Sequence, residues 1–381
     1  MAKDRKVHEE ETQEEAPIYG DILETVLSHV PLIDLVSASQ VSRSWSGAVS
    51  SSLRHLKRIK PWLIVHTQST RPPYATTAHA YDPRSGDWIQ IHHQPPTDHV
   101  SALRSSHSTL SYMLSPSKFA FSSDPLRLTW HVVDAPLVWR TDPIVAEVGD
   151  SVVVAGGACD YEDDPLSVEV YDRRNGEWSA CQSMPAMLKD SAASTSLSVA
   201  VHGGKMYVAE KCSGLTHSFD PNSKAWRGPY DLRPDQGVFC LVIESAGGNL
   251  IAVGVVGSPE SIKTVKMWKF SGESLEDVEV VGEMPEEMVE KLKGESSYVP
   301  SVNVVARGSF VFIHNPSEPE EVIQCDIGNG RCRWGSVRNA VVNDTTRMQR
   351  MVVGCSDVAM VDLRKAMLMD DSLRFAAKHL E

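Results

Sequence analysis

The chain has 381 residues, a net charge of −13, and 41% hydrophobic and 23% charged residues. This length suits one small module and one large domain, and the composition is that of a globular protein. The negative charge excludes a basic footprint over nucleic acid, and no apolar run reaches the roughly 20 residues that cross a bilayer. We therefore expect no nucleic-acid partner and no membrane partner.

The seven cysteines are irregularly spaced, and none forms a C-x-x-C pair. This pattern predicts neither a disulfide framework nor a zinc site. It favours a reducing compartment, the cytoplasm or the nucleus. We expect no metal and no cofactor.

Residues 1–16 are rich in charge and contain no aromatic side chain. Such a segment buries too little apolar surface to offset the entropy of ordering it, so we expect a disordered acidic tail.

Residues 17–60 carry apolar residues at helical spacing and predict a module of three short helices. Pro31 ends the first helix and Pro61 ends the module. The stripes are Ile22, Leu23, Val26, Leu27 and Val30 in the first helix, Leu32, Leu35 and Val36 in the second, and Val41, Trp45, Val49 and Leu53 in the third. A module this small has little core of its own, so its stability is expected to depend on a partner.

From Trp62 onward the hydrophobic period becomes two, which is typical of strands. A hairpin pattern recurs in which an aromatic residue and Asp precede a tryptophan, with seven residues from the aromatic to the tryptophan. Its copies are Tyr81-Asp82 with Trp88, Tyr171-Asp172 with Trp178, and Phe219-Asp220 with Trp226. A repeat of this length, with four strands in each unit, is the signature of propeller blades. The tryptophan is expected to pack between sheets and the aspartate to cap the turn.

The pattern divides the β region into six units, 62–91, 106–133, 144–180, 197–228, 238–282 and 302–337. The first unit lacks an innermost strand, and the strand-rich segment Arg350–Leu363 is left over. We expect this segment to complete the first blade and close a propeller that spans residues 61–363. Residues 364–381 have helical composition.

The helical module resembles an F-box in Asp21–Pro31, Leu35 and Val41–Trp45, and the hairpins with Gly156-Gly157 resemble kelch repeats. Together they resemble a plant F-box/kelch-repeat protein. The fold class is thus multidomain α plus all-β, a three-helix F-box followed by a kelch β-propeller of six blades. One departure is that Ile18-Tyr19-Gly20 stands where the family has Leu-Pro.

The resemblance implies a substrate receptor of a Skp–cullin–F-box ubiquitin ligase, with a Skp-family adaptor and, through it, a cullin ligase as partners. The implied adaptor-binding residues are Leu23, Val26, Leu27, Val30, Pro31, Leu35, Val41 and Trp45. Direct contact is favoured for Leu23, Leu27 and Pro31. The resemblance also implies a reasonable substrate, an enzyme of phenylpropanoid or flavonoid synthesis such as phenylalanine ammonia-lyase or chalcone synthase.

An enzyme of propeller architecture is the competing class. No G-x-S-x-G, H-E-x-x-H or P-loop motif occurs, and no set of His, Tyr and Cys has convincing metal-ligand spacing. We therefore expect a non-catalytic adaptor. The remaining alternative is a kelch interaction scaffold that recruits no ligase.

In antiparallel blades, the connections between second and third strands share a face with the crossovers between blades. These connections are expected to be long at Cys159–Leu166, Gly257–Ile262 and His314–Glu321. Long loops on a rigid scaffold usually carry recognition, so the protein substrate is expected on this face. The candidate contacts are Tyr161, Asp163, Asp164, Pro259 and Glu318.

Overall fold

A computed structural model describes residues 20–55, 60–71, 74–92, 101–124, 126, 128–159, 163–328, 332–341, 349–369 and 374–378. The chain forms two compact units that divide between residues 59 and 60. The predicted acidic tail, residues 1–16, lies outside the described residues.

The first unit consists of α1 (Asp21–Leu27), α2 (Leu32–Val41) and α3 (Arg43–His55), and both α1 and α2 contact α3. Val41 ends α2, so its predicted place in the third helix is wrong. Ser42 is extended, and its hydroxyl accepts the backbone N–H of Trp45 at 3.2 Å. A serine in this position caps a new helix, which is why the chain breaks between α2 and α3.

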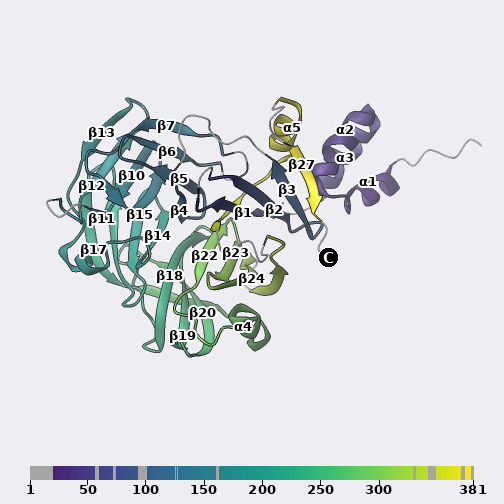
Figure 1. The fold of residues 1–381 in the computed structure, drawn as a ribbon. Helices are drawn as coiled ribbons and strands as arrows, with labels where there is room; N and C mark the ends of the chain where they lie inside the picture. The colour runs from purple at the N-terminus through teal and green to yellow at the C-terminus, as the bar shows by residue number, and fades with distance from the viewer. Residues whose placement is uncertain are drawn as a thin grey trace, which may run out of the picture. The chain divides into compact units, whose positions relative to one another are not determined.

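The second unit contains six sheets of four or five antiparallel strands, which confirms the predicted six-bladed propeller (Figure 1). Blades are numbered in the order in which their second strands follow one another along the chain. From the first strand outward, blade 1 consists of β26 (Gln349–Ser356), β1 (Trp62–Ser69), β2 (Thr76–Asp82), β3 (Asp87–His92) and β27 (Arg374–Lys378). Blade 2 consists of β4 (Leu103–His107), β5 (Leu110–Leu114), β6 (Lys118–Ser122) and β7 (His131–Asp134). Blade 3 consists of β9 (Ile144–Val148), β10 (Ser151–Ala155), β12 (Val168–Asp172) and β13 (Glu177–Ala180).

Blades 4 to 6 follow the same order. Blade 4 consists of β14 (Leu197–His202), β15 (Lys205–Glu210), β16 (Leu215–Asp220) and β17 (Ala225–Asp231). Blade 5 consists of β18 (Val238–Ala246), β19 (Asn249–Ser258), β20 (Ser261–Ser271) and β21 (Asp277–Glu283). Blade 6 consists of β22 (Asn303–Arg307), β23 (Phe310–Asn315), β24 (Glu318–Asp326) and β25 (Arg333–Arg338). The short strands β8 (Arg140–Thr141) and β11 (Ala158–Cys159) pair with each other beside blade 3.

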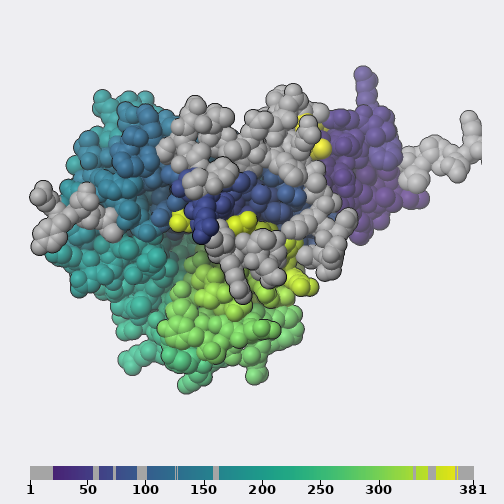
Figure 2. All heavy atoms as spheres, viewed as in Figure 1, coloured from purple at the N-terminus to yellow at the C-terminus, as the bar shows by residue number. Residues whose placement is uncertain are grey.

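The first strands of the blades contact one another in a ring, in the order β26, β4, β9, β14, β18 and β22. The ring closes through β26, which pairs antiparallel with β1 from Trp62↔Ser356 to Ser69↔Gln349. In the space-filling view, yellow residues from the end of the chain lie between the blue and green residues of the neighbouring blades (Figure 2). The core consists of apolar clusters between adjacent blades, for example between blades 3 and 4 and between blades 5 and 6.

The C-terminal part of the chain differs from the helical expectation for residues 364–381. The helix α5 (Met360–Met369) begins within the segment expected to be a strand, and Arg374–Lys378 forms β27. β27 pairs with β3 as a fifth strand. The outer edge of blade 1 offers unpaired backbone groups, and pairing with an edge overrides a helical composition.

The repeated hairpins explain the seven-residue spacing, because the aromatic and the tryptophan face each other across the third and fourth strands. The ring centroids of Tyr81 and Trp88 are 5.5 Å apart, and those of Phe219 and Trp226 are 5.0 Å apart. The carboxylate of Asp82 accepts the backbone N–H of Arg84 at 2.9 Å, which confirms the predicted capping of the turn.

Each of these tryptophans also reaches the preceding blade. Trp88 Nε1 donates to the carbonyl of Arg338 in blade 6 at 3.0 Å. In the same way, Trp178 donates to Asp134 O at 2.9 Å and Trp226 to Gln182 O at 3.0 Å. The repeat therefore ties each of these blades to the one before it.

Candidate functional site

One face of the propeller carries both the connections between second and third strands and the crossovers between blades. Backbone hydrogen bonds join the two sets, from Ala135 N to Ser117 O at 3.2 Å in blade 2 and from Val299 N to Pro259 O at 2.8 Å in blade 5. A third bond runs from Asn339 N to Glu320 O at 2.7 Å in blade 6. We call this side the loop face.

Two of the connections expected to be long loops are tight hairpins. Ser258 pairs with Ser261, and Asn315 pairs with Glu318, so only two residues turn the chain in each case. Pro259 and Pro316 open these turns, and proline presets the backbone angle that the first central residue of a turn needs. The prediction of long loops at Gly257–Ile262 and His314–Glu321 is therefore wrong.

The crossovers, rather than these hairpins, carry large apolar side chains exposed to solvent on the loop face. They are Leu137 after blade 2, Met187 after blade 3 and Tyr298 after blade 5, which are 77%, 58% and 51% exposed. An exposed apolar side chain on its own is ordinary, and these three lie on three different crossovers of one face, which makes them candidate contacts for a partner.

Leu137 is held by a buried ion pair. Arg140 and Glu169 are both almost fully buried and are paired side chain to side chain. The Glu169 carboxylate also accepts the backbone N–H groups of Leu137 at 2.6 Å and Val138 at 3.2 Å. A buried charge needs such partners, so the pair fixes the backbone from which Leu137 projects.

Met187 lies in the short 3₁₀ helix η1 (Ala186–Ser191), beside the fully buried Leu188. Gly157 N donates to Ala192 O at 2.8 Å, which ties the crossover to the end of blade 3. Gly156 has a φ of 66°, and a Cβ there would lie 2.5 Å from Ala192 O. The paired glycines thus allow the crossover to approach the blade closely.

Tyr298 follows α4 (Glu286–Lys293), a crossover helix that buries Val289 and Leu292. The next residue, Val299, is buried and bonded to Pro259. Ser296 Oγ donates to the Tyr298 carbonyl at 2.8 Å. Since its own carbonyl and the next residue are both hydrogen-bonded, the exposed ring is presented from an ordered backbone.

The sequence-predicted substrate residues are divided between two regions of the loop face. Pro259 lies against the crossover after blade 5, and Glu318 begins β24 of blade 6 and lies beside Gly294 of the same crossover. Asp163 and Asp164 lie in blade 3, and Tyr161 lies outside the described residues. The Asp164 carboxylate accepts Leu166 N at 2.9 Å and the Ser183 hydroxyl at 2.7 Å, so it holds its own loop.

The residues predicted to bind the adaptor also separate into two sets. Leu23, Leu27 and Leu35 are buried, whereas Val26 and Val41 are at least half exposed. Val30, Pro31 and Trp45 are partly buried. Ile22 belongs to the same stripe as Val26 and is also exposed, although it was not among the predicted contacts.

Leu23 and Leu27 are buried within the unit, and their direct contact with an adaptor stays a prediction. On α1, Leu23 and Leu27 form one column and Ile22 and Val26 the neighbouring column, about 100° around the helix. Only the first column faces inward. Among the described residues of this unit, the large apolar side chains exposed to solvent are those of Ile22, Val26 and Val41.

The described residues contain no group of three or more His, Cys, Asp or Glu arranged to hold a metal ion. Among the described helices, none is long and apolar enough to span a membrane.

Two comparisons of the sequence with known proteins agree with this architecture. Residues 20–57 match the F-box domain family. The chain is 45% identical over 368 residues to the F-box/kelch-repeat protein At1g23390 of Arabidopsis thaliana, and the match covers 93% of each protein. A solved structure titled "Structure of YjhT" is similar at a TM-score of 0.39 and 13% identity, over 55% of this chain and 68% of that one.

An F-box module followed by a β-propeller defines the class of a two-part binding protein. The match to the Arabidopsis protein extends over both units and identifies the family more specifically. The chain belongs to the F-box/kelch-repeat family.

Proposed function

We propose that the protein is the substrate receptor of a Skp–cullin–F-box ubiquitin ligase in the cytoplasm or nucleus, and that it is a non-catalytic adaptor. The observation that carries the proposal is that one chain exposes apolar side chains on both of its units. The F-box presents Ile22, Val26 and Val41, and the loop face presents Leu137, Met187 and Tyr298. One surface binds a Skp-family adaptor, and through it a cullin, while the other captures the protein to be ubiquitinated.

The adaptor surface is supported by the geometry of α1 and α2. Both helices bury one column of leucines on α3 and leave aliphatic side chains exposed beside it. Such a surface fits against the helices of a partner. Leu23, Leu27 and Leu35 then shape the surface from beneath.

The adaptor surface is tested by co-precipitation of the full chain with a purified Skp-family adaptor. Val26→Asp combined with Val41→Asp is expected to weaken binding more than about tenfold, because each change places a charge in an apolar interface. Val280→Asp is the matched control, since this valine is equally exposed but lies on β21 of the propeller. Failure of the unaltered chain to bind the adaptor, or equal binding by the double variant, would contradict the proposal.

The substrate surface is supported by its ordered backbone and by the residue types it exposes. Tyrosine and methionine are enriched at protein interfaces, and leucine adds apolar area. Asp163, Asp164, Pro259 and Glu318 would lie around these anchors, and the carboxylates favour a substrate with a complementary basic patch.

Within this proposal, the first substrates to test are phenylalanine ammonia-lyase and chalcone synthase, enzymes of phenylpropanoid and flavonoid synthesis. Only the family resemblance supports this choice. Comparing the proteins that accumulate when residues 17–60 are deleted would test it without presupposing the substrate.

A kelch scaffold that recruits no ligase is the second candidate, and one observation favours it. The sequence has Ile18-Tyr19-Gly20 where the family has Leu-Pro, which changes one edge of the F-box. The co-precipitation with the adaptor separates the two candidates, because a scaffold of this kind would not bind it.

A further inference from the structure

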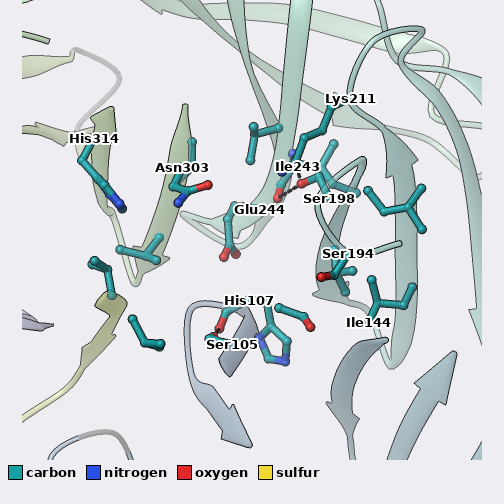
Figure 3. Close-up of a pocket in the computed structure, with 18 of the residues that line it drawn as sticks. Ser105, His107, Ile144, Ser194, Ser198, Lys211, Ile243, Glu244, Asn303 and His314 are labelled. Atoms are coloured by element: carbon teal, nitrogen blue, oxygen red, sulfur yellow. Dashed lines mark hydrogen bonds between the residues drawn. The ribbon is translucent and has the colours of Figure 1, made fainter. Parts of the chain in front are cut away.

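The propeller axis holds a cavity of about 170 Å³ among the first strands of the blades. Asn303, where β22 begins, His314 near the end of β23, and Lys211 after β15 all line it. These positions are at the loop-face ends of their strands, so the cavity opens toward the loop face. Figure 3 shows His314 and Asn303 projecting from neighbouring strands into the space that Glu244 and His107 border.

A hydrogen-bond network forms the floor of this cavity. Ser108 donates its hydroxyl and its backbone N–H to Glu244 Oε1, and it accepts Ala306 N at 2.7 Å. Cys355 N donates to Ser108 O at 3.1 Å. Glu244 and His107 also line a second cavity of about 510 Å³, on the side of Arg307 and Asp357. The network therefore separates the two ends of the axis.

Two buried histidines that line the cavity each have an unpartnered ring nitrogen. His314 is 3% exposed and His107 is 9% exposed. In the part of the chain that the structure describes, no residue supplies a hydrogen-bond partner to His314 Nδ1 or His107 Nε2. Buried polar atoms are nearly always hydrogen-bonded, so these two nitrogen atoms are candidates for hydrogen bonds to a bound molecule or to water.

The charges around the cavity favour an uncharged guest. Burial lowers the pKa of both His107 and His314 to about 4, so both rings are neutral near pH 7. Burial disfavours the charged form of both remaining ionisable groups, since it lowers the pKa of Lys211 and raises the pKa of Glu244 to about 7. A charged guest would lose its hydration on entering the same buried site, whereas a hydroxyl group can donate to or accept from either histidine tautomer.

The size of the cavity and the residues of its wall further limit the kind of ligand that it can bind. About 170 Å³ is below the roughly 300–1,000 Å³ that drug-sized ligands occupy. Among the described residues that line it there is no Phe, Tyr or Trp, so a flat aromatic guest would find no ring to stack on. The aliphatic wall, which includes Val242, Val304 and Val352, suits the C–H faces of a small polyol.

We propose that the central cavity binds a small, uncharged polyhydroxylated molecule, a polyol or a monosaccharide, through His314, His107 and Asn303. Such binding is independent of the ligase role proposed above.

Ligand-observed NMR on the full chain tests the proposal with glucose and myo-inositol as neutral probes. Gluconate and glucosamine supply an anion and a cation of similar size. At least one neutral probe is expected to show saturation transfer at millimolar concentration, with at least about tenfold weaker binding of its charged counterparts. Absence of transfer to both neutral probes, or a preference for a charged one, would overturn the proposal.

Substitutions then locate the site. His314→Leu is expected to weaken binding about tenfold, the effect of one lost hydrogen bond. His217→Leu is the matched control, because His217 is also a buried histidine with an unpartnered nitrogen but does not line the cavity. If His314→Leu fails to fold, Asn303→Leu at the exposed rim provides the same test. Unchanged binding in the folded variant, or a soaked crystal with only water in the cavity, would contradict the assignment.

Discussion

A side-chain hydrogen bond from Trp88 helps to join blades 1 and 6, which meet where the ring closes. The donor is in blade 1 and the acceptor, Arg338 O, is in blade 6. The indole is 1% exposed and packs against Tyr81. The side chain therefore contributes both apolar contact and a directional bond, and the two contributions can be measured separately.

Trp88→Phe is expected to lower the free energy of unfolding by at least about 1 kcal/mol, because a six-membered ring remains but the Nε1–H bond and part of the buried ring are lost. Trp88→Ala is expected to cost about 3–5 kcal/mol, since the whole ring leaves a cavity. Urea unfolding followed by circular dichroism measures both values. No loss in Trp88→Phe would show that the hydrogen bond does not contribute to stability.

Glu244 gives the propeller a dependence on pH. Burial raises the pKa of its carboxyl to about 7, even though Ser108 and Ser245 donate hydrogen bonds to it. An acid with a raised folded-state pKa binds more protons when folded. Its contribution to stability is full below the unfolded value of about 4.5 and is lost as the pH rises through about 7.

We expect the free energy of unfolding to fall between about pH 6 and about pH 8. This fall is part of the whole contribution of Glu244 to stability, which is at most about 3 kcal/mol. His107 and His314 act in the opposite sense, but only as the pH falls from about 6.5 toward 4. Burial also raises the pKa of the nearby Cys355 thiol, which keeps it protonated in this window. Urea unfolding across this range should show the fall in the unaltered chain and not in Glu244→Gln. A fall that persists in the variant would assign it to another group.

At the scale of elements, the two C-terminal strands have different roles in the same blade. β26 is the first strand of blade 1, and it contributes the buried residues Val352, Val353 and Cys355. β27 pairs only with β3, as the fifth strand. Removal of β26 would open the ring and leave β1 unpaired on one side, whereas removal of β27 would only shorten the sheet.

A chain that ends at residue 369 is therefore expected to keep a cooperative unfolding transition and resistance to protease. A chain that ends at residue 348 should lose both, because apolar clusters between blade 1 and both of its neighbours are broken. Limited proteolysis and thermal unfolding compare the two. Equal behaviour of the two truncated chains would contradict the distinct role of β26.

At the scale of the whole molecule, the proposed function requires that the two apolar surfaces act separately. Leu137 and Tyr298 are exposed, so their replacement should change stability by no more than about 0.5 kcal/mol. Neither belongs to the F-box unit. Changes at Leu137 and Tyr298 should therefore affect capture of the substrate without affecting binding of the adaptor.

Leu137→Asp combined with Tyr298→Asp is expected to reduce capture more than about tenfold while adaptor binding stays at its original level. Capture is measured as recovery, with the full chain, of the proteins that accumulate when residues 17–60 are deleted. Val280→Asp again serves as the control, since it alters an exposed valine away from the loop face. Unaltered recovery with the double variant would place the substrate elsewhere.

The sequence by itself determined the class of each unit and the number of blades. Helical and two-residue periods come from local geometry, and the Tyr-Asp to Trp spacing is the length of one hairpin, so both can be read along the chain. The leftover segment before residue 363 predicted the closing strand in the same way, since an unpaired first blade needs one.

Only the tertiary structure decided which side chains reach solvent. Leu23 and Ile22 are adjacent, equally apolar residues, and packing on α3 decided which of them is buried. The hairpins at Pro259 and Pro316 and the exposed crossovers depend on contacts between residues far apart in sequence. The same is true of the central cavity, where six blades bring His107, Glu244 and His314 together. Periodicity describes one element at a time, and these features arise where elements meet.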